Sequence, residues 1–435
     1  MTLFTTYHEA IEWIHSRLAF GVKPGLERMK WLMNRLDHPE QKIKAVHVAG
    51  TNGKGSTIAF TRSVLQEAGY SVGTFTSPFI LTFNERISVN GAPIQDEEWL
   101  SLVNEIKPYV DELDGTELGA ATEFEIITAC AFAYFAHVRQ VDFVLLETGL
   151  GGRLDSTNVA VPILTAITSI GHDHMAILGD TLEQIAAEKA GIIKDGIPMI
   201  TAVHQREALA VIQNTAIEKN AVCISLHDTC TFDQQQPTET GERFTLRTPK
   251  RQYPELETGL IGTHQRQNAS LAVLLIEWLV QEGHISVTEE HLYEGIRQAV
   301  WAGRFEKVKD HPPVYLDGAH NEEGMDRLIE TVQAHFSSKQ VHVCFSALKD
   351  KPYKQMIEKL EAISSSIHFV SFDFPRAESA EKLYACSHLE TKSYDDDPRA
   401  VLEWIQKKSA DPLAVILVTG SLYFISDMRN RILGS

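Results

Sequence analysis

One stretch near the N-terminus restricts the fold of the chain more than any other. Residues 46–56 read VHVAGTNGKGS, where a β-branched run breaks into a glycine-rich loop, and a helical pattern follows from Ser56 to Ala68. The three glycines let the loop backbone turn its N–H groups inward, and the helix N-terminus adds the positive end of its dipole. Lys54 can reach the outer phosphates of a nucleotide. The stretch therefore predicts a strand, a phosphate-binding loop and a helix, and with them nucleotide triphosphate chemistry.

The loop differs from the common pattern G-x-x-x-x-G-K-[ST] at two places. Val48 occupies the position of the first glycine, and Gly55 separates Lys54 from Ser56. An ordinary glycine-rich turn between a strand and a helix is the competing interpretation. We favour the phosphate loop because strand, loop, lysine and helix all stand in the required order.

Length, charge and cysteine content limit the class of protein. At 435 residues the chain is too long for one ordinary core, so two or three domains are expected. Its five cysteines are dispersed without CxxC spacing, no apolar run approaches a membrane span, and the N-terminus lacks the apolar stretch of a signal peptide. The net charge of −18 argues against non-specific nucleic-acid binding. We expect a cytoplasmic monomer with reduced thiols and without nucleic-acid or membrane partners.

Strand-like and helix-like segments alternate through the first two thirds of the chain. The expected strands are short and apolar, at Lys44–Ala49, Ser71–Thr76, Asp142–Glu147 and Ile163–Ile170, with helical patterns such as Asp96–Leu113 and Glu123–Val138 between them. This predicts α/β doubly wound architecture around a mostly parallel sheet. The polar stretch Thr229–Pro254 predicts a small antiparallel β excursion, after which helices resume at Gln267–Gln281 and Thr288–Val300.

A second α/β series begins near Pro312. Its expected strands are Val314–Leu316, Val341–Phe345, Ile367–Phe372 and Ala414–Val418, and its helical patterns include Glu322–Phe336 and Pro398–Lys407. The helical pattern before it ends near Trp301–Gly303. We therefore expect a P-loop domain over residues 1–300 and a second, Rossmann-like α/β domain over residues 301–435.

An acid follows the third expected strand. Residues 142–153 read DFVLLETGLGGR, so the strand ends at Glu147 and enters a glycine loop. A carboxylate at the carboxyl end of a strand, beside a phosphate loop, is where a Mg²⁺ ligand is needed. A salt-bridged or helix-capping acid is the alternative.

A lysine and a histidine follow the fourth expected strand. Thr181 and Gln184 predict a capping box that starts a helix, and Lys189 falls in its last turn. Spacing alone favours a lysine that complements the helix dipole. His174 follows a strand end, where ligands gather, although Mg²⁺ ordinarily prefers oxygen.

Five strings of the chain are together similar to the folylpolyglutamate synthase and dihydrofolate synthase family of the Mur-ligase superfamily. They are GTNGKGS, TSPF with NERI, ETGLGGRLD, EKAGIIK and DGAHN. The similarity extends from Phe20 to Ser421 and is thin in residues 201–254 and 349–398. Ligases of cell-wall peptide synthesis carry a nucleotide-sugar domain before the phosphate loop. Only 53 residues precede Lys54 here, which favours the folate branch.

The resemblance implies a role for each matching residue. Nucleotide contacts are expected at Gly50, Thr51, Asn52, Gly53, Lys54, Gly55, Ser56, Asn268, Arg304 and Asp317. Ser77, Glu147, His174 and a carbamylated Lys189 are expected to hold two Mg²⁺ ions. The folate-type acceptor is expected at Lys23, Thr122, Phe124, Leu154 and Asp155, and the incoming amino acid near His320 and Ser421. Lys54, Lys189 and His320 are thus the expected catalytic residues.

These expectations combine into one reaction. An ATP-dependent ligase would add L-glutamate to dihydropteroate, to a reduced folate or to both, through an acyl phosphate that domain closure protects from water. Another amino-acid ligase of the superfamily is an alternative, and so is a P-loop ATPase or switch without a ligase step. The last would explain Lys54 and Glu147 but not the motifs around Lys189, Asp317 and His320.

Overall fold

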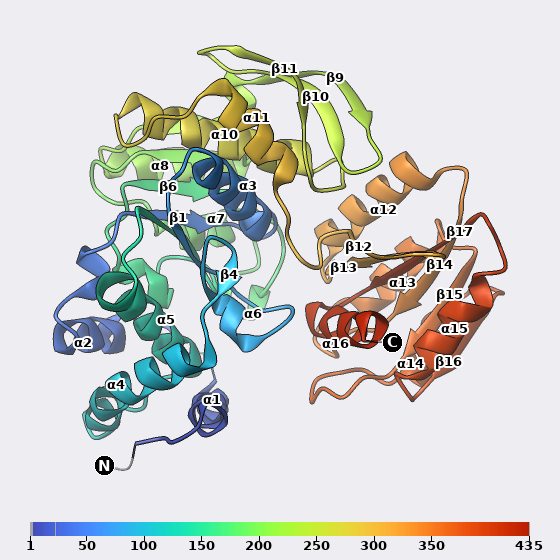
Figure 1. Cartoon of the computed structure of the whole chain (residues 1–435), viewed down its shortest axis with the longest axis horizontal. Helices are drawn as coiled ribbons and strands as arrows, with labels where there is room; N and C mark the ends of the chain where they lie inside the picture. Colours follow the sequence, from blue (N-terminus) through green and yellow to red (C-terminus); the bar gives the residue numbers. More distant parts are fainter. Residues whose placement is uncertain (1–2, 22, 435) are drawn as a thin grey trace. The chain divides into compact units, whose positions relative to one another are not determined.

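The computed structural model describes residues 3–21 and 23–434, which form two compact units (Figure 1). Unit 1 consists of Met1–Cys230 and Ser270–Gly295, and unit 2 of Thr231–Ala269 and Ile296–Ser435. Each unit is built around its own mostly parallel sheet. The α/β class predicted from the sequence is therefore confirmed.

The sheet of unit 1 has eight strands in the order β4-β3-β2-β5-β1-β6-β7-β8. The strands are β1 (Ala45–Ala49), β2 (Val72–Phe75), β3 (Ile87–Val89), β4 (Ala92–Pro93), β5 (Phe143–Glu147), β6 (Leu164–Ile167), β7 (Met199–Thr201) and β8 (Cys223–Ser225). The β2–β3 and β3–β4 pairs are antiparallel, whereas β1 pairs in parallel with β5 on one side and β6 on the other. The carboxyl end of β1 therefore lies at the centre of the sheet, where doubly wound folds bind their ligands.

Helices of unit 1 cover this sheet in separate groups. Those before residue 231 are α1 (Tyr7–Ser16), α2 (Glu27–Arg35), α3 (Lys54–Glu67), α4 (Asp96–Asp114), α5 (Glu123–Ala133), α6 (Met175–Leu178), α7 (Leu182–Ala190), α8 (Arg206–Glu218) and α9 (Leu226–Thr229). Residues 270–295, which carry most of two later helices, also belong to unit 1. One apolar core contains residues of α1, α2, α4 and α5 with β2 and β5, and another contains residues of α6, α7 and α8 with β6. The predicted helix Glu123–Val138 is α5 followed by a wider π-helical turn at Tyr134–Val138.

The predicted β excursion is a three-stranded antiparallel sheet of β9 (Thr231–Pro237), β10 (Glu242–Arg247) and β11 (Gln252–Glu257). It belongs to unit 2. The carboxylate of Glu242 is buried there, and it accepts hydrogen bonds from Arg266 at 3.0 Å and His335 at 2.7 Å. Two long helices follow, α10 (Gln265–Gln281) and α11 (Glu289–Gln298).

The main sheet of unit 2 has six strands in the order β12-β13-β17-β14-β15-β16, drawn in orange to red in Figure 1. The strands are β12 (Glu306–Asp310), β13 (Pro313–Asp317), β14 (Gln340–Phe345), β15 (Ser366–Val370), β16 (Lys392–Asp395) and β17 (Ala414–Thr419). The helices are α12 (Glu322–Phe336), α13 (Tyr353–Glu361), α14 (Ala380–Cys386), α15 (Ala400–Lys408) and α16 (Leu422–Leu433). Val343 and Phe345 face the core with α12 to α14, whereas Cys344 faces the core with α15 and α16. Both faces of the sheet are thus covered, as its continuous apolar strands require.

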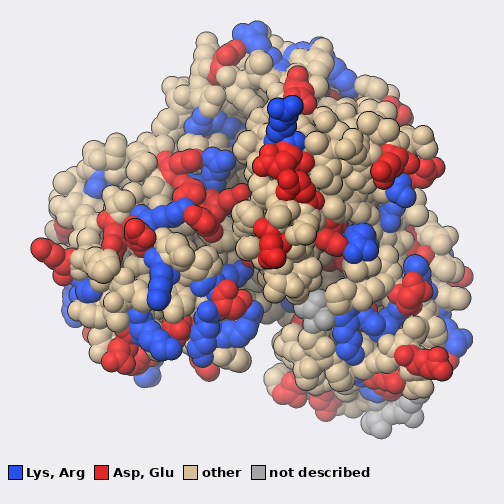
Figure 2. Space-filling model, turned by 180° about the vertical axis from the view of Figure 1, so that it is seen from behind, with Lys and Arg blue, Asp and Glu red and all other residues tan. Residues whose placement is uncertain are grey.

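In the described ranges 3–21 and 23–434, none of the helices is both long enough and apolar enough to cross a bilayer. On the face drawn in Figure 2, acidic and basic side chains are interspersed.

Candidate active site

The phosphate loop predicted from the sequence connects β1 to α3. Gly50 has a φ of +152° and Gly53 a φ of +88°. A Cβ atom on Gly50 would lie 1.9 Å from the Thr168 hydroxyl oxygen, so only glycine fits there. The loop is held to the end of β6, because Thr51 N–H donates to the Ser169 carbonyl at 2.9 Å and the Thr168 hydroxyl donates to the Asn52 carbonyl at 2.6 Å. Sequence reasoning missed these contacts of Thr168 and Ser169. The only sign of them in the sequence is a pair of adjacent hydroxyl residues near a strand end.

Three of the predicted residues converge beside this loop. The Lys54 ammonium donates to the carbonyls of Gly50 at 3.0 Å and Thr51 at 3.2 Å, and it lies 3.9 Å from Glu147 Oε1. Glu147 is buried at the end of β5, and its Oε2 accepts the backbone N–H of Ser77 at 3.1 Å. A cation, a carboxylate and a serine therefore meet at the carboxyl ends of adjacent parallel strands.

Lys189 reaches the same loop from α7. The capping box of Thr181 and Gln184 starts α7 as predicted, and Lys189 lies in the last turn of that helix. It is only 4% exposed, and its ammonium donates to the Gly50 carbonyl at 3.0 Å, so the side chain does not lie on the surface. Burial and, to a smaller extent, the nearby Lys54 charge together lower the pKa of Lys189 to about 7. A substantial neutral fraction of Lys189 follows near neutral pH.

His174 is more exposed than these buried groups. It precedes α6 with a φ of 51°, and its side chain is 48% exposed, 3.9 Å from Asp173 Oδ1. Within the part of the chain that the structure describes, no group of three or more histidine, cysteine, aspartate or glutamate side chains is arranged to hold a metal ion. The carboxylate of Glu147 and the hydroxyl of Ser77 nevertheless fit a Mg²⁺ ion that takes its other ligands from phosphate oxygens and water.

The predicted acceptor residues of unit 1 differ in what their side chains contact. The Phe124 ring stacks on Phe75 with centroids 5.8 Å apart, and a Cβ atom on Gly149 would lie 2.5 Å from that ring. Leu154 is partly exposed. Thr122, in contrast, caps α5 through a box with Glu125.

Asp155 and Lys23 also make bonds within the protein. The buried Asp155 carboxylate accepts the N–H groups of Leu150 at 2.8 Å and Thr157 at 3.0 Å, and burial raises its pKa. The Lys23 ammonium donates to the Ala120 carbonyl at 3.1 Å and lies 4.8 Å from the Phe20 ring. Residue 22, next to Lys23 in the chain, lies outside the described residues.

Unit 2 brings together Arg304, Asp317 and His320. Asp317 ends β13, and its buried carboxylate accepts the N–H groups of Phe305 at 3.0 Å and Ala319 at 2.9 Å. Burial raises the pKa of Asp317, and the positive charge of Arg304 opposes that rise. A Cβ atom on Gly318 would lie 2.7 Å from Arg304 Nη1, which places the guanidinium against the DGAHN loop. The His320 Nδ1 lies 2.7 Å from the Gly318 carbonyl oxygen.

The two other predicted residues of unit 2 are buried. Asn268 lies in the first turn of α10 and donates to Gln265 Oε1 at 2.9 Å. Ser421 precedes α16, and its side chain makes no capping bond. Ser346, which sequence reasoning missed, and Thr419 lie at the carboxyl ends of β14 and β17. Their buried hydroxyls have no hydrogen-bond partner among the described residues, a feature that the sequence does not signal.

The class of protein follows from this fold and loop once the chain is compared with known families. Residues 48–276 match the Mur ligase middle domain, and residues 303–422 match the glutamate ligase domain of Mur ligases. The dihydrofolate synthase/folylpolyglutamate synthase of Bacillus subtilis (strain 168) is 60% identical over 430 residues, which cover 99% of this chain and 100% of that protein.

Solved structures agree with this assignment. The folylpolyglutamate synthase of Mycobacterium tuberculosis complexed with ADP superposes with a TM-score of 0.91 at 26% identity, covering 98% of each chain. An FPGS solved as a complex with AMPPCP and folate gives a TM-score of 0.84 at 31% identity, covering 99% of this chain and 100% of that one. The chain belongs to the folylpolyglutamate synthase and dihydrofolate synthase family of the Mur ligases.

Proposed function

We propose that this protein is an ATP-dependent ligase that adds L-glutamate to dihydropteroate, to reduced folyl(poly)glutamates or to both. The observation that carries the proposal is the convergence of Lys54 and Lys189 on the Gly50 carbonyl, beside Glu147, at the centre of the sheet. Names of relatives and the folate complex of one of them support the acceptor class.

The reaction requires two steps. A carboxylate oxygen of the acceptor attacks the γ-phosphorus of ATP, which gives an acyl phosphate and ADP. The amine of glutamate then attacks the acyl carbon, phosphate leaves, and the amine loses a proton as the amide forms. Lys54 stabilises the charge that develops on the transferred phosphoryl group, and a dry site protects the acyl phosphate from hydrolysis.

We propose in addition that two Mg²⁺ ions accompany ATP. Ser77 and Glu147 would hold one, and His174 with a carbamylated Lys189 would hold the other. Bound Mg²⁺ would supply positive charge to the phosphates. The lowered pKa of Lys189 favours the modification, because only a neutral amine adds CO₂ and the added group replaces a cation with oxygen ligands.

Residues of the second α/β series complete the proposal. We place Asp317 at the nucleotide ribose, Asn268 and Arg304 at the nucleotide, and His320 and Ser421 at the incoming glutamate. Residues 1–300 would form the ATP-binding domain and residues 301–435 the glutamate-ligase domain, in a cytoplasmic monomer.

An assay of ATP turnover tests this function. Purified protein is incubated with ATP, labelled glutamate and dihydropteroate or a reduced folate in turn, and phosphate release and label transfer are followed together. We expect phosphate release only when glutamate and an acceptor are both present, with one amide formed per phosphate. Phosphate release that is the same without glutamate and acceptor would instead identify an ATPase or switch.

A further inference from the structure

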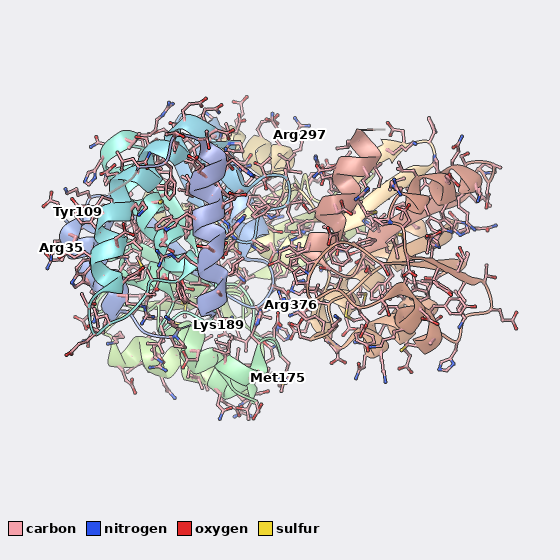
Figure 3. The ribbon with its side chains drawn as sticks, turned by 90° about the horizontal axis from the view of Figure 1, so that it is seen from below. Arg35, Tyr109, Met175, Lys189, Arg297 and Arg376 are labelled. Carbon is pink, nitrogen blue, oxygen red and sulfur yellow. The ribbon has the colours of Figure 1, made fainter. Side chains whose placement is uncertain are left out.

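The glycine loop after β5, residues 149–155, is packed against two elements that carry proposed functional residues. On one side the Phe124 ring of α5 lies against Gly149. On the other side, a Cβ atom on Gly152 would lie 2.8 Å from the Lys189 carbonyl oxygen and 3.0 Å from that of Glu188. Gly152 is therefore needed for the close contact with the last turn of α7. Figure 3 labels Lys189 in that turn.

Two sets of contacts fasten this loop to α7. The backbone N–H of Arg153 donates to the Glu188 carbonyl at 2.7 Å, and the Arg153 guanidinium pairs with the Glu188 carboxylate at 2.7 Å. The side-chain amide of Asn158 donates to the carbonyls of Arg153 and Gly191, at 3.0 Å each. Gly191 is the residue at which α7 ends.

The Asn158 side chain is buried, and its amide N–H groups make the two bonds that join the loop to α7. The residue is 5% exposed, its backbone carbonyl accepts the Lys194 ammonium at 2.8 Å, and its side-chain oxygen has no hydrogen-bond partner among the described residues. Its side-chain N–H groups supply a donor to both carbonyls that it bridges, and a carbonyl that loses its donor on folding costs free energy to the extent that it is shielded from water. A carboxylate at this position would place an oxygen against two carbonyl oxygens, and a methyl group would leave both without this donor.

We propose that Asn158 is a positioning residue of the ligase reaction, which locks the glycine loop to the end of α7. The lock fixes the spacing between the acceptor residues Phe124 and Leu154 on one side and Lys189 on the other. The proposal rests on the proposed function. It assigns Asn158 no contact with substrate: the residue acts through the loop and through α7.

The first test compares Asn158→Ala with Asn104→Ala. Asn104 is a matched control, because it bridges the backbone N–H and carbonyl of Phe4 at 2.8 Å and 3.0 Å. Hydrogen exchange of the ligand-free proteins is followed for peptides that cover residues 149–158 and 182–192. We expect Asn158→Ala to raise the exchange rate of the Arg153 amide about tenfold, with no change in Asn104→Ala. Equal exchange at Arg153 in wild type and Asn158→Ala would overturn the proposal.

Kinetics of the same variants separate positioning from general destabilisation. We expect Asn158→Ala to raise the acceptor KM about tenfold and to lower kcat, while ADP affinity by calorimetry stays within about twofold. Asn104→Ala should lower Tm by about as much as Asn158→Ala does, without changing the acceptor KM. The same kinetic constants in both variants would show that Asn158 is only structural. A wild-type protein without acceptor-dependent turnover would defeat the proposed function, and the exchange comparison would still decide whether the lock exists.

A charge exchange provides a second test that does not depend on the folding of Asn158→Ala. The Arg153 and Glu188 side chains are 56% and 23% exposed, so either can be reversed without burying a charge. Arg153→Glu and Glu188→Arg should each raise the exchange rate of residues 149–158 and the acceptor KM by about threefold, and the double reversal should restore both. A double variant as impaired as the single ones would contradict the proposed lock.

Discussion

The carboxyl edges of the two parallel sheets bury opposite charges. At the edge of unit 1, Lys54 and Lys189 donate to one backbone carbonyl, that of Gly50. At the edge of unit 2, Asp317 accepts two backbone N–H groups and has the positive charge of Arg304 beside it. Burial pushes the pKa of Lys189 down and that of Asp317 up, so both groups move toward their neutral forms.

Lys189 and Asp317 differ in how a neighbouring charge acts on the pKa shift that burial causes. Lys54 adds a like charge to Lys189 and lowers its pKa further, whereas Arg304 adds an opposite charge to Asp317 and limits the rise of its pKa. The unit 1 edge therefore presents the Lys54 ammonium, with Glu147 3.9 Å away, to an anionic ligand, whereas the carboxylate at the unit 2 edge is partly compensated by Arg304. We infer that phosphate activation depends on the unit 1 edge and that the unit 2 edge mainly serves binding and amide formation.

The largest expected effect is that of Lys54→Ala. Removing a fixed positive group from a developing phosphoryl charge should lower kcat about 10²- to 10³-fold, equivalent to about two to four kcal/mol. The fold should persist, because the Lys54 side chain donates to carbonyls of its own loop and its ion pair with Glu147 is long, at 3.9 Å. Lys30→Ala on α2 is the control, since Lys30 is exposed and paired with Glu27. Equal turnover of the two variants would refute the phosphate-loop assignment.

Lys189→Ala should come next, with a loss of about a hundredfold in activity and of part of the metal affinity. A short carboxylic acid in the medium should restore part of the activity of this variant, because it supplies oxygen ligands where the carbamate is removed. Lys189→Arg should not respond, since a guanidinium repels a metal ion. Full activity of Lys189→Ala would return this lysine to a role at the helix end.

Asp317→Asn should have a smaller effect on the reaction. The amide keeps the shape of the carboxylate but cannot accept both N–H groups equally well, so we expect ADP affinity to fall about tenfold. Isothermal titration with ADP measures this directly, and the effect on acyl phosphate formation should not exceed the effect on binding. A loss of turnover as large as that of Lys54→Ala would remove the contrast between the two edges.

The stability of Asp317→Asn relative to wild type should depend weakly on pH. Because the folded pKa of Asp317 is raised above the usual value of 3.8, the folded chain binds this proton more tightly than the unfolded chain does. The contribution of Asp317 to stability therefore falls as the pH rises from 3.8 through the raised pKa. The Tm of Asp317→Asn relative to wild type should increase over that pH window. A difference that stays flat or decreases would mean that the neighbours of Asp317 outweigh its burial.

The sequence predicted the features that local patterns encode. The apolar strands, the glycine loop and the capping box of α7 all depend on residues close together in the chain, and the structure has them within a few residues of the expected positions. The edge strands β12 and β16 were missed, because EKVKD and KSYD are polar and pair only through the neighbouring strand.

The candidate site was predictable where each residue follows its own strand, as Lys54, Glu147 and Asp317 do. The contacts that organise the site join segments far apart in the chain. The Thr168 hydroxyl, after β6, donates to the phosphate loop, which follows β1. The Asn158 side chain donates to Gly191 at the end of α7, more than thirty residues further along the chain. No spacing in the sequence reveals such partners, because they depend on the strand order of the sheet.

The most direct test of the contrast is a single-turnover, rapid-quench measurement of acyl phosphate with ATP, acceptor and glutamate. The comparison needs two variants, Lys54→Ala for the unit 1 edge and His320→Ala for the unit 2 edge. We predict that Lys54→Ala forms acyl phosphate about 10²- to 10³-fold more slowly than wild type, whereas His320→Ala forms it with a burst of ADP and accumulates it, because amide formation is impaired. Acyl phosphate formed at the wild-type rate in Lys54→Ala, or its absence in His320→Ala, would contradict the division of roles between the two edges.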